Sequence, residues 1–135
     1  MSSWRLAKSL ECLRDQINVA HPKRSKVSDG SIGDARHSAR GSASDHNPNE
    51  RGIVCAIDIT HDPANRVDGH ILSRELITDP RQKYVIFAGE IFKARTGVWE
   101  PYHGANRHDH HVHISVKSEV CDNIEPWTLV QPPTT

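Results

Sequence analysis

Residues 108–116 read HDHHVHISV, with four histidines in the first six positions. From residue 111 onward apolar and polar residues alternate, which predicts a strand with one face on a core. The side chains expected to face away from that core are His111, His113 and Ser115. Two imidazoles on one face can share a metal ion, since neutral imidazole is a common zinc ligand and also a general base near pH 7. A histidine-rich loop, or a strand with an ordinary polar face, is the alternative interpretation.

Composition limits the classes of protein to which the chain can belong. Its 135 residues fit one domain, predicted over 1–135 with about 120–135 as a C-terminal tail. Lysine plus arginine equals aspartate plus glutamate at 17 each, so the net charge points neither to nucleic acid nor to an anionic membrane. The cysteines are odd in number and form no CxxC pair, which argues against a disulfide framework and a cysteine zinc site; they are Cys12, Cys55 and Cys121.

The apolar runs are too short for a membrane span or a signal-peptide core. We therefore expect a protein that is made in the cytoplasm without a signal peptide and does not insert into a membrane. A monomer is expected.

Several other segments have readable patterns. The spacing of Trp4 and the leucines that follow predicts a helix over residues 4–19, capped by Ser2 or Ser3. We also predict a strand over 53–60, a helix over about 69–78 capped by Asp68, and a hairpin over 84–93 that turns at residues 88–89. This order predicts an α+β fold, with a largely antiparallel central sheet, flanking helices and a zinc site on the sheet.

Two features outside residues 108–116 point to a site. Residues 21–52 form a long polar stretch rich in turn residues, which we interpret as a functional loop because it leads into His46. Asp58 lies within the apolar run IVCAIDIT, where an acid is costly unless it is paired or binds a metal. A salt bridge or a strand-end cap is the alternative for Asp58.

A catalytic zinc ion needs three protein ligands and one position for water. His46, Asp58 and His113 offer such a set, although iron(II) fits the same ligand count. His111 shares a strand face with His113 and is the expected base for the bound water. His108 or Asp109 would orient that imidazole or stabilise the oxyanion.

The order His, Asp, His-x-His resembles the zinc peptidases that cleave bacterial peptidoglycan, a group of D-Ala-D-Ala carboxypeptidases, L-Ala-D-Glu and lysostaphin-type endopeptidases, and phage endolysins. Ser44-Asp45-His46 and Ala56-Ile57-Asp58 match the two ends of the group's motif SxHxxGxAxD. His111-Val112-His113 matches its second motif, and His108 completes the extended form HxxHxH. The residues that make up these motifs are most similar to those of small phage endolysins.

The resemblance implies a zinc-dependent peptidase acting on peptidoglycan peptides. It implies His46, Asp58 and His113 as ligands, His111 as a catalytic histidine and Ser44 as a substrate contact. A phage lysin would reach the wall through a holin pore.

Two departures from the group's pattern leave alternatives open. The interval from His46 to Asp58 is longer than in the motif, and the motif glycine is not at its expected place. Branches with an acid three residues before the last ligand would need it at His110, beside Asp109, so Asp109 is the alternative base. A zinc-stabilised binding module without catalysis and a cytoplasmic D,D-dipeptidase are the alternative functions. A non-haem iron oxygenase is disfavoured, because the HxD spacing of its ligands is absent.

Overall fold

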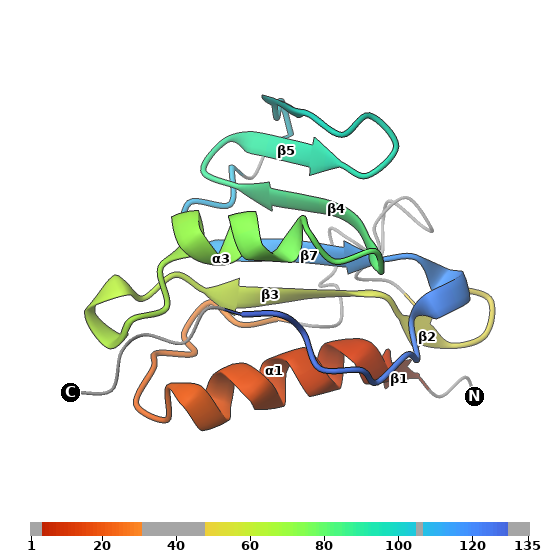
Figure 1. Ribbon diagram of the computed structural model, residues 1–135, viewed down its shortest axis with the longest axis horizontal. Coiled ribbons are helices and arrows are strands. Elements are labelled where there is room, and N and C mark those ends of the chain that lie inside the picture. Colours follow the sequence, from red (N-terminus) through yellow and green to blue (C-terminus); the bar gives the residue numbers. More distant parts are fainter. Residues whose placement is uncertain (1–3, 31–47, 105–106, 130–135) are drawn as a thin grey trace.

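The centre of the molecule is a five-stranded antiparallel sheet (Figure 1). The computed structural model describes residues 4–30, 48–104 and 107–129. The strands follow one another across the sheet in the order β3 (Ala56–Thr60), β7 (His111–Val116), β4 (Gln82–Phe87), β5 (Glu90–Lys93) and β6 (Trp99–Pro101). Within these described ranges the other elements are a parallel pair, β1 (Arg5–Leu6) with β2 (Ile53–Val54), two α-helices, α1 (Lys8–Ala20) and α3 (Gly69–Leu76), and short 3₁₀ turns at Pro63–Asn65 and Ser118–Val120. The predicted α+β fold with a largely antiparallel sheet is confirmed.

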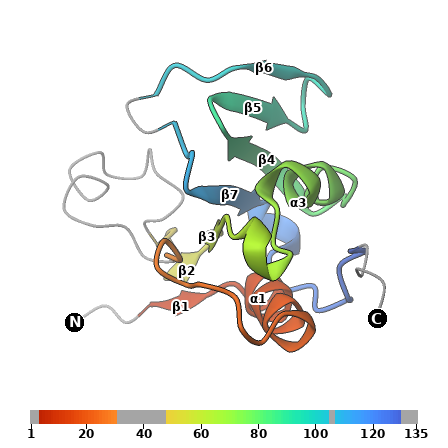
Figure 2. The same ribbon diagram turned by 90° about the vertical axis from the view of Figure 1, so that its left-hand side faces the viewer.

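One face of the sheet carries the hydrophobic core. Alternate residues of the central strands are almost fully buried there: Ile57, Ile59, Val85, Val112 and Ile114. Helix α3 packs along β4 and β7, and α1 contacts β3 at the edge of the sheet (Figures 1 and 2). Because side chains alternate along a strand, the residues between these apolar ones belong to the opposite face. That face holds Asp58, His111, His113 and Ser115, as the alternation predicts.

The N-terminal segment differs from its prediction. Arg5 and Leu6 form β1 and pair with Ile53 and Val54, so the helix begins at Lys8 and not at residue 4. Two hydrogen bonds across this pair, from Arg5 N to the Gly52 carbonyl and from Ala7 N to the Val54 carbonyl, satisfy backbone N–H groups that the first turn of a longer helix would have left without an acceptor. The predicted caps Ser2 and Ser3 lie outside the described residues.

The predicted strand over 53–60 is interrupted at Cys55. Residues on its two sides pair with different partners, β2 with β1 and β3 with β7. The apolar run gave no signal for this change, because both halves are buried.

Helix α3 and the hairpin confirm their predictions. The Asp68 side chain accepts a hydrogen bond from His70 N, and the helix ends at Leu76, two residues earlier than expected. β4 and β5 turn at Ala88 and Gly89, whose φ angles of 52° and 80° are both positive, as in a type I′ turn. In the described part of the chain, no helix has both the length and the apolar character needed to cross a bilayer.

The segment 121–129 packs on α1. Trp127 is 3% exposed, and its indole N–H donates to the Ser9 carbonyl at 2.9 Å. Gln16 makes two hydrogen bonds with the Trp127 backbone, and the Arg81 guanidinium lies 4.1 Å from the indole centroid. Trp127 therefore joins the C-terminal segment to the core.

We expect Trp127→Ala to lower the free energy of unfolding by about 3–5 kcal/mol, because it removes a large buried side chain and leaves a cavity. Urea denaturation followed by circular dichroism measures the change. Trp4→Ala is the matched control, since Trp4 is 45% exposed and its loss should change stability by about 0.5 kcal/mol or less. Equal effects of the two substitutions would contradict the packing role of Trp127.

A buried ion pair ties the segment after α1 to the end of β3. The Arg24 guanidinium is fully buried and donates two hydrogen bonds to the Asp29 carboxylate, at 3.0 and 2.7 Å. Thr60 donates to the same carboxylate through its backbone N and its hydroxyl. Burial alone would raise the pKa of Asp29, but the hydrogen bonds from Arg24 and Thr60 outweigh it and hold the pKa below its usual value.

Asp29→Asn should lower the free energy of unfolding at pH 7 by about 3–5 kcal/mol, because it leaves the Arg24 charge buried without its partner. A lowered carboxyl pKa contributes stability above about pH 4, the unfolded value, and this stability is lost as the pH falls toward the folded value. The difference between wild type and variant should therefore shrink below about pH 4. Denaturation curves at pH 7 and pH 3 test this, with the exposed Asp15→Asn as control. A difference that does not change with pH would contradict the assignment.

Candidate metal centre

Asp58 is fixed on both sides by backbone hydrogen bonding. In the antiparallel register it lies directly opposite His113 of β7. On the outer side, Gly30 N donates to the Asp58 carbonyl at 3.2 Å, and Asp58 N donates to the Gly30 carbonyl at 2.8 Å. The carboxylate, 15% exposed, therefore projects from a rigid part of the sheet, which suits a ligand that must hold its geometry.

Each carboxylate oxygen of Asp58 has an imidazole nitrogen beside it. His113 Nδ1 lies 3.2 Å from Oδ1, and His111 Nε2 lies 3.4 Å from Oδ2. Two atoms bound to one zinc ion at 2.0–2.1 Å and a tetrahedral angle are about 3.3–3.4 Å apart. Both separations therefore suit hydrogen bonding as well as shared coordination of a metal.

His108 reaches the site through an unusual backbone conformation. Its φ angle is +61°, in the left-handed region that residues other than glycine rarely adopt. The β4–β5 turn holds it there, since Ala88 N donates to the His108 carbonyl at 3.1 Å. The His108 ring is almost buried and packs edge-on against the ring of His111, with centroids 4.9 Å apart. Such strained positions cluster at functional sites.

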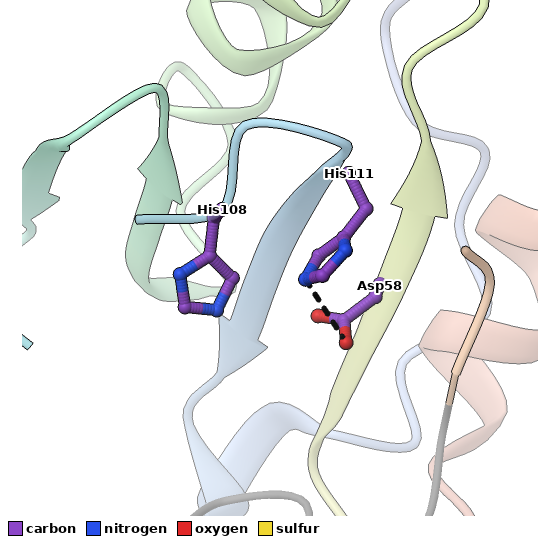
Figure 3. Close-up of side chains that lie close together, drawn as sticks. All are labelled: Asp58, His108 and His111. Atoms are coloured by element: carbon purple, nitrogen blue, oxygen red, sulfur yellow. Dashed lines mark ion pairs between the residues drawn. The ribbon is translucent and has the colours of Figure 1, made fainter. Parts of the chain in front are cut away.

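Asp58, His108 and His111 form a group that could hold a metal ion. Each offers one ligand atom, and these atoms all lie within 4.8 Å of one another. Figure 3 shows the three side chains gathered beside β3 and β7, with the ion pair between His111 and Asp58. Two nitrogens and one oxygen suit zinc and other divalent transition metals.

A further chain of contacts runs from Asp58 through His113 to Ser115. His113 Nε2 lies 2.8 Å from the Ser115 hydroxyl, opposite the Nδ1 that faces Asp58. This is the order of a serine-hydrolase triad. Ser115 is 0% exposed in the interior of β7, so its hydroxyl cannot reach a substrate carbonyl. The contacts therefore orient the His113 ring and do not form a nucleophile.

The other residues expected at the site differ in their placement. His46 and Ser44 lie outside the described residues. Asp109 is half exposed, and its carboxylate lies 3.4 Å from Arg107 Nε.

Two site residues received no role in the sequence analysis. Tyr84 of β4 stacks on the His113 ring, with 10° between the planes and 5.2 Å between centroids. Only the register of β4 with β7 brings these rings together, so no local pattern indicates the contact. Ser115 could have been found, because the alternation of β7 places it on the face of His111 and His113.

Comparison of the chain with models of known protein families, with curated proteins and with solved structures gave no match.

Proposed function

We propose that the protein is a zinc-dependent peptidase that hydrolyses an amide bond in peptidoglycan stem peptides or cross-links. The observation that carries the proposal is the carboxylate of Asp58, which has an imidazole nitrogen at ligand spacing beside each oxygen. The substrate class comes from the resemblance of the motifs around His46, Asp58 and His113 to wall-cleaving zinc peptidases. Action on the wall after release through a holin pore belongs to the same proposal.

In this proposal Asp58 Oδ1 and His113 Nδ1 are two of the ligands, and His46 is the third by motif resemblance. A zinc ion held there would polarise the scissile carbonyl and lower the pKa of a bound water. The site is built on β3 and β7, adjacent strands whose pairing fixes the separation of Asp58 and His113.

His111 is the proposed general base. Its ring lies on the same face of β7 as His113, and its Nε2 is held 3.4 Å from Asp58 Oδ2. His108, packed against that ring, orients it and excludes water from its far side. Ser44 remains a proposed substrate contact.

One observation favours a second arrangement of the same centre. Among the described residues, Asp58, His108 and His111 form a group whose ligand atoms lie close enough to share one ion, so the two histidines could themselves be ligands. Asp58 is common to both arrangements. They differ in whether metal binding depends on His113 or on His108 and His111, so the metal content of single histidine variants separates them.

The test of the function is the zinc content of the purified protein, measured beside the loss of turbidity of outer-membrane-permeabilised bacterial cells. About one zinc per chain with lysis, abolished by a chelator and restored by zinc, is the expected result. Zinc without lysis would favour a free dipeptide substrate or a binding role. A metal-free protein that still lyses cells would overturn the proposal.

A further inference from the structure

We propose that Ser115 is a positioning residue of the metal centre: when His113 Nδ1 binds the metal, the Ser115 hydroxyl accepts the proton on Nε2 and holds the orientation of the ring. The inference rests on the proposed function, in which His113 binds zinc through Nδ1. His113 Nε2 lies 2.8 Å from the Ser115 hydroxyl, which can donate a hydrogen bond to this nitrogen or accept one from its N–H. A metal ion bound at Nδ1 and shared with Asp58 Oδ1 requires the proton to be on Nε2, and the hydroxyl then accepts a hydrogen bond from that N–H.

The contact between His113 and Ser115 is important because both side chains are buried. His113 is 4% exposed and Ser115 is 0% exposed, so solvent contributes little to the hydrogen bonding of either side chain. A buried ring N–H without an acceptor is destabilising, because its lost hydrogen bond to water is not replaced. The ring would otherwise shift toward whichever tautomer or rotamer found a partner.

The tautomer decides whether His113 can bind a metal. A neutral imidazole carries one N–H, and only its other nitrogen has a lone pair for coordination. Placing the proton on Nε2 makes the Nδ1 lone pair available for coordination, 3.2 Å from Asp58 Oδ1. Histidine ligands generally donate their second ring nitrogen to such a partner, whose removal lowers metal affinity about 10–100-fold.

The pairing of β7 with its neighbouring strands explains how Ser115 can position the His113 ring. In the register, Ser115 lies between Ala56 of β3 and Tyr84 of β4. The Tyr84 ring lies parallel to that of His113 and sets the plane of the imidazole. Ser115 then sets the rotation of the ring within that plane, so the two contacts together define the direction of Nδ1.

The experiment compares zinc affinities, measured by competition with a chromogenic chelator. Ser115→Ala should bind zinc about 10–100-fold more weakly than wild type. Ser115→Thr keeps the hydroxyl and should restore most of the affinity. Ser73→Ala is the matched control, since Ser73 is also buried but lies on α3 and bonds within its own helix. Unchanged affinity in Ser115→Ala would overturn the inference while leaving the peptidase proposal intact.

A second measurement uses the wild-type protein alone, so it does not depend on the folding of a variant. Imidazole ¹⁵N spectra of the zinc-loaded protein should show the His113 proton on Nε2 and zinc on Nδ1. A proton on Nδ1 would overturn the assignment. A wild-type chain that binds no zinc would reject the metal centre itself, and this outcome is distinct from an effect confined to Ser115.

Discussion

Asp58→Asn is expected to lower zinc affinity by more than about 100-fold, beyond the range for residues that only support a ligand. Asp58 is the one residue common to both arrangements of the centre, because its two oxygens face His113 and His111 separately. The amide has almost the same shape as the carboxylate but lacks its charge and offers one oxygen in place of two. Zinc per chain after gel filtration, and turbidity loss of permeabilised cells, should fall together.

Asp109→Asn is the matched control for this substitution. Asp109 precedes β7 by two positions but is half exposed and pairs with Arg107, so its loss should leave the zinc content unchanged. Lysis by this variant also tests Asp109 as the alternative base. Retention of one zinc per chain by Asp58→Asn would mean that the ion is held by a ligand set without this carboxylate.

The elements that could be predicted from the sequence are those specified by local patterns. β7 follows from strict alternation, α3 from its apolar spacing and the Asp68 cap, and the hairpin from the residues at 88–89. In each case the residues that form the element also indicate where it begins and ends.

Elements that depend on distant partners could not be predicted in this way. β1 exists because Arg5 and Leu6 pair with Ile53 and Val54, nearly fifty residues away. Trp127 is buried against α1, where Ser9 and Gln16 are its hydrogen-bonding partners. No pattern within a window of ten or fifteen residues contains that information.

The candidate site was predictable in part for the same reason. Alternation placed His111 and His113 on one face, and the cost of an acid in an apolar strand singled out Asp58. The register of β3 with β7, which sets those residues side by side, and the positive φ of His108 come from tertiary structure. The strand register and this backbone conformation determine which imidazole nitrogen lies near which carboxylate oxygen.

His111→Ala is expected to abolish most lytic activity while leaving about one zinc per chain. Loss of a general base typically lowers the rate about 10²–10⁴-fold, and in the proposed arrangement His111 is not a ligand. The measurement pairs the lysis rate with the zinc content of the same sample. His110→Ala is the control, because His110 is exposed in the same stretch and its contact with His61 is made by the backbone carbonyl, which alanine keeps.

The zinc content of the His111 variant decides between the two arrangements of the centre. If zinc and activity disappear together in both His111→Ala and His108→Ala, while His113→Ala keeps its zinc, the ion is bound by the group Asp58, His108 and His111. If His113→Ala loses zinc and His111→Ala keeps it, the ion lies on the Oδ1 side of Asp58. In that case His111, beside Oδ2, would not be a ligand and would act as the base that takes the proton from the attacking water.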